Sequence, residues 1–285
     1  SGAQDGGGGI RNDGTLTVTN SIVSGNTASQ FGGGIANNSG STLTVRNSTI
    51  SGNTANGNGT GGGIDTDGPT NIINSTISGN NAPNGNGNGG GIFVLDSSTT
   101  NIVNSTITNN SAAGSGSSSG VFRQGGTLTL RNSIVAANQN NTTQPDVVAS
   151  GGTGITSNGF NLIGNRGTVT FGATGDQAGG NGNPIINPRL GPLADNGGPT
   201  RTHALLAGST ALDAGNNSGS GTLTDQRGGN FRRPFDLPSV TNAPNSDASD
   251  IGAFEAQTAP VAQNRAPFDY DGDNKTDISI FRPAP

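Results

Sequence analysis

A short motif recurs along the first half of the chain, and it constrains the fold more than any other feature. Each copy begins with small residues, mostly Gly, followed by an aliphatic residue, and continues through alternating Thr and aliphatic residues to an Asn-Ser pair. The Asn of that pair stands at positions 20, 47, 74, 104 and 132, so the steps are 27, 27, 30 and 28 residues. A period of this length is typical of repeat proteins in which each repeat is one supersecondary unit.

Within one copy, the pattern is that of short strands rather than helices. Leu43 and Val45 alternate with Thr44 and Arg46, which is the two-residue period of a strand. β-Branched residues fill these stretches, and Gly, Asn and Ser fill the gaps between them. Each unit is therefore expected to contain about three short strands joined by turns.

Strands of only ~4 residues are unstable as an isolated meander. Stacked coils stabilise them, because every strand then pairs in parallel with its copy in the next coil, at a spacing of about 4.8 Å. The sequence therefore predicts an all-β fold, a parallel β-helix (β-solenoid) of about ten coils. We expect a right-handed column from the usual chirality of parallel crossover connections.

Two Asn positions in each repeat predict columns of stacked side chains. An Asn in a tight turn tolerates the left-handed backbone region, and its amide can bond the same Asn one coil above. The first predicted ladder contains Asn20, Asn47, Asn74, Asn104 and Asn132. The second contains Asn26, Asn53, Asn80, Asn110 and Asn138.

Only 28% of the residues are hydrophobic and 51 are Gly, a composition that by itself resembles disorder. The repeat argues otherwise, since a solenoid core is a thin column that needs few apolar side chains in each coil. Ile35, Leu43, Val45 and Ile50 are the expected inward residues of one coil.

The charge and residue inventory exclude several classes of protein. The net charge is -5 with no basic patch, which argues against nucleic-acid binding. No run of about 18 apolar residues is present, so no membrane span is expected. The absence of Cys excludes disulfides and thiolate metal sites. A Gly-, Asn- and Thr-rich chain without Cys suits a secreted bacterial surface protein, so we expect an extracellular or cell-surface location.

Polar residues recur at one turn of each repeat, at Asp13, Asn38, Asp67, Asp96 and Gln124. We interpret them as turn side chains that bond the nearby backbone. The alternative is a carboxylate row for polysaccharide cleavage, which needs paired acids, or Ca²⁺ with a cationic base, on one face.

The residues that could serve a polysaccharide lyase or hydrolase are Asp65, Asp67, Arg46 and Arg123. This face has no Lys, no Glu and, by its sequence pattern, no aromatic platform for a sugar. We therefore predict no catalytic residue and expect that the chain is not an enzyme.

The second half of the chain carries a different series of motifs. It contains NPRLGPLADNGGPT at 187–200, ALDAG at 211–215 and DIGAFE at 250–255. This series resembles bacterial choice-of-anchor Q domain proteins, which carry polymorphic-outer-membrane-type repeats. The resemblance covers about residues 1–256 and implies a secreted or surface-anchored β-helix, with regular repeats over 1–140 and irregular coils and a cap over 141–256. It carries over no catalytic residue.

The charged residues near the end of this region are interpreted as a cap. A solenoid end must be polar or covered, because open strand edges invite pairing. We expect the column to be closed by a salt-bridged group, which consists of Asp225, Arg227, Arg233, Asp250 and Glu255. His203, the only His, has no nucleophile signature beside it and is interpreted as structural.

A Pro-containing linker at 257–267 leads to a short acidic tail at 268–285. Four Asp residues within nine positions around a Gly turn indicate a hard-cation loop. The loop is similar to the one that opens FG-GAP or VCBS-type repeats. That resemblance implies Ca²⁺ bound by Asp269, Asp271, Asp273 and Asp277, with a backbone carbonyl near Lys275.

Together these features predict a non-enzymatic extracellular solenoid with a structural or adhesive role. A further hypothesis is a head-to-tail surface filament, fastened by strand addition of the tail. The expected partners are other copies of the chain, cell-surface components or glycans. The alternative is a polysaccharide-binding or polysaccharide-cleaving β-helix, or a pure ligand-binding module.

Overall fold

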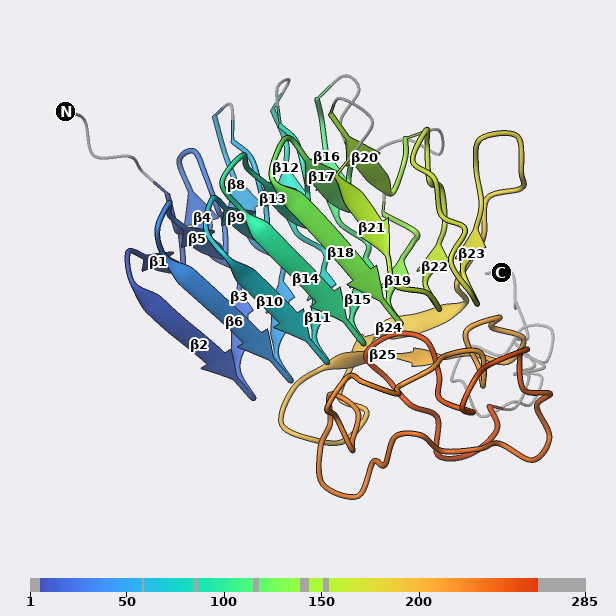
Figure 1. The fold of residues 1–285 in the computed structure, drawn as a ribbon. Helices are drawn as coiled ribbons and strands as arrows, with labels where there is room; N and C mark the ends of the chain where they lie inside the picture. The colour runs from blue at the N-terminus through green and yellow to red at the C-terminus, as the bar shows by residue number, and fades with distance from the viewer. Residues whose placement is uncertain are drawn as a thin grey trace, which may run out of the picture.

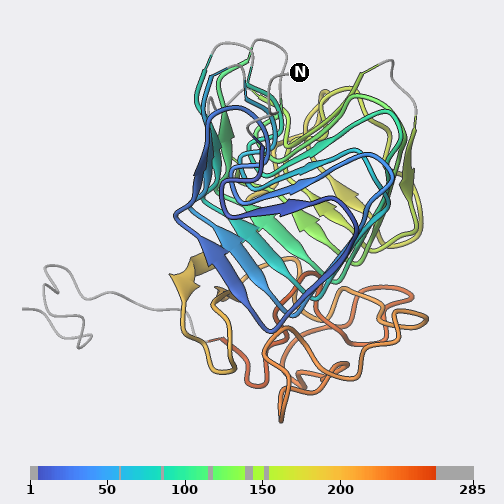
Figure 2. The ribbon, with the colours of Figure 1, turned by 90° about the vertical axis from the view of Figure 1, so that its left-hand side faces the viewer.

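The computed structural model describes residues 6–57, 59–84, 87–114, 118–138, 144–150 and 154–260. This part of the chain is all-β and contains no helix. Its short strands stack in parallel as a β-solenoid, seen from the side in Figure 1 and along the column in Figure 2. The described residues include no helix that is long and apolar enough to cross a membrane.

Each regular coil consists of three or four very short strands. The first coil contains β1 (Ile10–Asn12), β2 (Thr15–Thr19), β3 (Ile22–Ser24) and β4 (Thr27–Ala28). The later coils contain β5 (Ile35–Asn37), β6 (Thr42–Arg46), β7 (Thr49–Ser51), β8 (Thr54–Ala55), β9 (Ile64–Thr66), β10 (Thr70–Ile73), β11 (Thr76–Ser78), β12 (Asn81–Ala82), β13 (Ile92–Val94), β14 (Thr99–Val103), β15 (Thr106–Thr108), β16 (Ser111–Ala112), β17 (Val121–Arg123), β18 (Thr127–Arg131) and β19 (Ile134–Val135). An irregular end follows, with β20 (Val147–Ala149), β21 (Ile155–Ser157), β22 (Leu162–Ile163) and β23 (Gln177–Ala178).

Equivalent strands of successive coils form four parallel sheets. Sheet 1 has the order β1-β5-β9-β13-β17-β20, and sheet 2 has the order β2-β6-β10-β14-β18-β21. Sheet 3 runs from β3 to β23 through β7, β11, β15, β19 and β22, and sheet 4 contains β4, β8, β12 and β16. Matching repeat positions pair in register, so that Ile35 lies between Ile10 and Ile64. The predicted parallel β-helix is confirmed.

The column is shorter than predicted. Five regular coils are followed only by the irregular strands β20 to β23, so the expectation of about ten coils is too high. The cause is the segment at 187–256, hereafter the flank segment, which adds no strand to the column. It begins with β24 (Leu190–Ala194) and β25 (Thr202–Leu205), which pair antiparallel, and then lies along one side of the coils (Figures 1 and 2).

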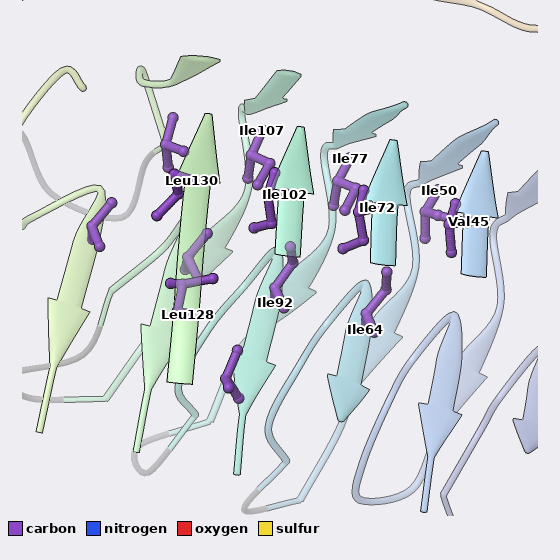
Figure 3. Packing of buried hydrophobic residues seen from close by; sticks show 14 of the residues in the cluster. Val45, Ile50, Ile64, Ile72, Ile77, Ile92, Ile102, Ile107, Leu128 and Leu130 are labelled. Atoms are coloured by element: carbon purple, nitrogen blue, oxygen red, sulfur yellow. The ribbon is translucent and has the colours of Figure 1, made fainter. Parts of the chain in front are cut away.

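The core is a narrow column of aliphatic side chains. Equivalent residues of adjacent coils form rows along the axis, as Ile64 and Ile92 do in Figure 3. Most of these side chains are completely buried, although each coil supplies only a few of them. Val169 and Phe171 pack against the same core after the last regular coil. Residues from the irregular stretch thus cover the far end of the column.

The second predicted Asn ladder is present and buried. Nδ2 of Asn53 donates to Oδ1 of Asn80 at 2.9 Å, and Nδ2 of Asn80 donates to Oδ1 of Asn110 at 2.9 Å. Oδ1 of Asn80 also accepts the backbone N–H of Asn53, and Oδ1 of Asn110 accepts that of Asn80. Nδ2 of Asn80 donates in addition to the carbonyl of Ile50 in the preceding coil. The row runs from Asn26 to Asn138. Two side-chain and two backbone groups per coil are satisfied in this way, without water.

Asp146 continues this ladder where the repeat becomes irregular. Its Oδ1 accepts the backbone and side-chain N–H groups of Asn138, and its Oδ2 accepts the backbone N–H of Asn165. Burial raises the pKa of Asp146 to about 6. The carboxylate therefore replaces an amide at the last step of the row.

The first predicted Asn ladder is mostly wrong. Its members do adopt the left-handed backbone, with φ between 46° and 50° from Asn20 to Asn132. However, only Asn132 bonds its equivalent, donating to Oδ1 of Asn104 at 2.9 Å. The Oδ1 atoms of Asn47 and Asn74 have no partner. Nδ2 of Asn74 instead donates to the carbonyl of Thr224 in the flank segment, because this turn faces that segment.

The residue after each of these Asn forms a ladder that the sequence analysis did not predict. Oγ of Ser75 accepts the backbone N–H of Ser48, and Oγ of Ser105 accepts that of Ser75. Oγ of Ser133 continues the series by accepting the N–H of Ser105. Ser at this position thus satisfies a backbone donor that the tight turn leaves out of the sheets.

The glycines before each Ile are required by the close stacking of coils. Gly32 has a φ of 58°, which favours glycine. A Cβ on Gly33 would lie 2.3 Å from the carbonyl oxygen of Gly62 in the next coil, and one on Gly34 would lie 2.7 Å from that of Gly63. The Gly triplet therefore permits backbone-to-backbone contact between coils at the edge beside sheet 1.

We predict that Asn80→Ala lowers the free energy of unfolding by about 2–3 kcal/mol, because it leaves buried donors and acceptors of two neighbouring coils unpaired. Asn101→Ala is the matched control, since the half-buried side chain of Asn101 bonds, within the described part of the chain, only the side chain of Asn71, at 3.1 Å. It should cost at most about 0.5 kcal/mol. Urea denaturation of both variants measures the difference, and equal losses would contradict a stabilising role for the ladder.

Candidate functional site

A surface hollow with a volume of about 510 Å³ lies on the outer face of sheet 1. Ala36, Asp65 and Phe93 form its floor at one matching position of β5, β9 and β13. Phe31 and Thr60 line one side, from the loops that precede β5 and β9. The other side consists of the last residue of β5 and residues from the turns after β5, β9, β13 and β17, which are Asn37, Asn38, Ser39, Asp67, Leu95 and Gln124.

Asp65 is the one buried carboxyl group in the floor of this hollow. Thr60 Oγ1 donates to its Oδ2 at 2.5 Å, and only 6% of the residue is exposed. Burial raises the pKa of Asp65 to about 7, with the nearby Asp67 carboxylate acting in the same direction and the Thr60 bond opposing it. Below that pH the group is a neutral acid that can donate a hydrogen bond.

The sequence led us to expect no aromatic side chains on this face, and that expectation is wrong. Phe93 and Phe122 occupy the same outward position of β13 and β17, and their rings stack at a centroid distance of 5.4 Å with an interplanar angle of 8°. Phe93 lies in the floor of the hollow, and the half-buried Phe31 lines one of its sides. The error arose because these Phe residues are far apart in the sequence and only the parallel register brings them to one face.

Three of the recurring polar turn residues, Asp13, Asn38 and Asp67, bond neighbouring coils rather than only their own turns. Asp13 accepts from Arg11 and from Nδ2 of Asn38 in the next coil, and Arg11 therefore holds the pKa of Asp13 below its usual range. Asp67 accepts the backbone N–H of Ser97 at 3.2 Å. Three of these turn residues, Asn38, Asp67 and Gln124, also line the hollow.

The residues considered for polysaccharide cleavage do not converge. Asp65 and Asp67 line the hollow, but Arg46 and Arg123 do not. The Arg123 guanidinium donates to the carbonyls of Gly126 and Ser150, so it supports a turn. Within the described ranges, no group of three or more His, Cys, Asp or Glu residues could hold a metal ion.

The five charged residues predicted as a cap form one buried network, but at a different place. Arg227 pairs with Asp225 at 2.7 Å, and Arg233 pairs with Glu255 at 2.8 Å. The backbone N–H of Glu255 donates to Asp225, and that of Asp250 donates to Glu255. This network lies in the flank segment along the side of the column, so it does not close the column end (Figure 1).

Aromatic rings complete the environment of one of these cations. The Arg227 guanidinium lies 3.6 Å from the centroid of the Phe231 ring and 3.8 Å from that of Phe254. Such cation–π contacts together with a carboxylate partner compensate for the loss of hydration. The network is therefore structural, and its five charged residues are at most 6% exposed.

Polar groups also fasten the flank segment to successive coils. Gln226 lies between Thr76, whose hydroxyl donates to it at 2.6 Å, and Thr49, to which it donates at 3.0 Å. The Thr106 hydroxyl accepts the backbone N–H of Ala253 at 3.0 Å. A second apolar cluster, which includes Ile134 and Leu212, fills the remaining interface. The flank segment thus joins several coils into one body.

His203 lies inside this interface. Its Nδ1 lies 2.7 Å from the carbonyl oxygen of Gly191, and its Nε2 lies 2.8 Å from Oγ of Ser78. Burial lowers the pKa of His203, so the ring is neutral, and Ser78 then donates to Nε2. A nucleophile and base can have this geometry, but His203 and Ser78 are only 2% and 3% exposed, so no substrate reaches them. The pair is structural, as the sequence indicated.

The predicted Ca²⁺ loop, with Asp269, Asp271, Asp273, Lys275 and Asp277, lies outside the described residues, as does most of the 257–267 linker. No family model, no curated protein and no solved structure matches this chain. The resemblance to choice-of-anchor Q domain proteins therefore stays a prediction, and the site has to be interpreted from its own chemistry.

Asp65 is expected to make stability depend on pH. Its folded pKa of about 7 exceeds the usual value of 3.8, so the folded state binds more protons than the unfolded state between these values. Stability from this group is complete below pH 3.8 and is lost as pH rises through 7. Asp65→Asn keeps a neutral side chain at every pH, so relative to the native protein it should gain at least about 1 kcal/mol between pH 4 and pH 8.

The measurement is urea unfolding of both proteins across this pH range. The difference between the two curves isolates Asp65, because other buried acids such as Asp146 are common to both. Parallel curves would show that Asp65 titrates normally in the folded protein.

Proposed function

We propose that this protein is a non-enzymatic extracellular solenoid with a structural or adhesive role. The observation that carries this proposal is how the polar side chains are used. The amides of the Asn ladder, hydroxyls such as that of Thr76 and the ion pairs of the flank segment are each buried and hydrogen-bonded within the protein. Few reactive side chains are therefore left on the described surface, and the coils and the flank segment together form a rigid body on which binding surfaces can be displayed.

The extracellular assignment is supported by composition and by the resemblance described for 187–256. The chain contains no Cys and 51 Gly, and a fold held by backbone ladders and amides does not depend on disulfides or on the redox state of its surroundings. The Ca²⁺ loop at 268–285 is part of the same proposal, because a hard-cation loop suits an environment with abundant calcium.

The first coil favours a more specific role as the subunit of a filament. Within the described part of the chain, β1, β2, β3 and β4 each have a strand neighbour on one side only. A Cβ on Gly25 would meet no atom within 4 Å, whereas one on its equivalent Gly52 would have N of Gly25, in the preceding coil, as its nearest neighbour at 4.0 Å, so this position faces the open end. These edges present the same pattern that the next coil of this chain pairs with. At the other end of the described column, β20 and β21 also have one strand neighbour each, so the proposed partner is that end of a second copy, and such head-to-tail contacts do not close.

We expect the full chain to assemble into filaments as its concentration rises. Gly25→Asp should abolish assembly by placing a charge on the contact, and Asp tolerates the left-handed backbone of this position, where φ is 68°. Gly221→Asp is the matched control, since the exposed Gly221 has a φ of 71° and lies on the flank segment. Sedimentation velocity and electron microscopy detect the filaments. Assembly that is insensitive to Gly25→Asp, or a monomer at every concentration, would contradict the filament role.

A further inference from the structure

We propose that the hollow on sheet 1 binds a neutral saccharide segment, and that it does so without cleaving it. This inference rests on the proposed adhesive role and names the ligand class for that role. Its volume of about 510 Å³ is within the range that holds a small ligand. Side chains from four successive coils meet there, so the site exists only in the stacked protein.

The hollow combines two kinds of surface. Its apolar lining consists of the buried side chains of Ala36 and Phe93 in the floor and the half-buried ring of Phe31 on one side. Its opposite rim is polar, with the side chains of Asn38, Asp67 and Gln124. A sugar ring has a face of C–H groups and an edge of hydroxyls, so it matches this division. An aromatic wall suits the C–H face because the negative face of the ring attracts the slightly positive hydrogens.

The polar groups on the rim retain hydrogen-bonding capacity. Gln124 is exposed, and its side-chain amide bonds no other residue in the described part of the chain, so it can both donate and accept. Asp67 uses Oδ1 for the Ser97 N–H and keeps Oδ2. Asp65 adds a carboxyl group at the floor, held by Thr60. Adjacent hydroxyls of a saccharide, which donate and accept, are suited to such a mixed set.

The charge of the lining selects a neutral ligand. Among the residues that the structure describes, no Lys or Arg lines the hollow, and Asp67 lies on its rim. A uronate, sulfate or phosphate group would have no cation to pair with and would be repelled by this carboxylate. The site therefore excludes acidic polysaccharides.

The absence of a catalytic pair indicates binding rather than cleavage. Glycoside hydrolysis uses two acids that flank the scissile bond in different protonation states. Here Asp65 is buried in the floor against Thr60, and Asp67, two residues further along the same coil, lies on the rim and is bonded to the backbone of Ser97. Among the described lining residues, no acid or His other than these two is placed to protonate a leaving oxygen.

The test is isothermal titration of the full chain with cellohexaose, maltohexaose and chitohexaose, each up to about 1 mM, a range that detects weak binding. Hexagalacturonate is the acidic control. We expect at least one neutral probe to bind and hexagalacturonate not to bind. Phe31→Ala and Gln124→Ala should each weaken that binding roughly five- to tenfold, since each removes one contact. Leu223→Ala, on the flank segment, should leave it unchanged.

No binding of any neutral probe, equal binding of hexagalacturonate, or affinity that is unchanged in both Phe31→Ala and Gln124→Ala would overturn the inference. Circular dichroism of each variant shows whether the fold is retained, and the exposed Gln124 provides a variant that does not disturb the core. Recovery of the probes after incubation separates the two proposals. Cleaved probe would overturn the non-enzymatic function, whereas intact probe without binding would overturn only the ligand assignment.

Discussion

Close parallel stacking of coils is the constraint on which the rest of the structure depends. Strands of two to five residues cannot form a stable sheet alone, so each coil relies on its neighbours for backbone pairing. The Asn53–Asn80–Asn110 amides bond one another inside the turn, where neither sheet satisfies the backbone. Gly33 and its equivalents let the coils come close enough for those bonds to form. Apolar burial, although small in each coil, is thereby repeated along the axis.

The flank segment forms hydrogen bonds with polar groups that the stacked coils leave unpaired at one corner. One corner of each coil turns through a left-handed Asn and leaves polar groups pointing sideways, away from the sheets. Gln226 and the Thr224 carbonyl bond these groups on neighbouring coils, and the charged network around Glu255 keeps the flank backbone in place. The flank segment thus covers this corner and sheet 3, whereas the hollow lies on sheet 1 and is lined by none of its residues.

The sequence was sufficient for features that repeat and insufficient for those that do not. The regular spacing of the Asn residues from Asn26 to Asn138 predicts the buried ladder, and the alternation of Thr and aliphatic residues around Val45 predicts the parallel stack of strands. The flank segment has no period, so its lateral position could not be distinguished from further coils, and the bond between Asn74 and this segment could not be predicted. The hollow was missed for a related reason. Phe31, Asp65 and Phe93 belong to different repeats, and only the register of β5, β9 and β13 brings them together.

Amide hydrogen exchange, followed peptide by peptide, tests most directly whether the stacked ladders hold the molecule together. Groups that open only when the whole structure unfolds exchange most slowly. We expect the slowest exchange in peptides that contain the Asn53, Asn80 and Asn110 turns, and much faster exchange in the flank residues 238–248. Exchange at these three turns that is as fast as in 238–248 would contradict the account.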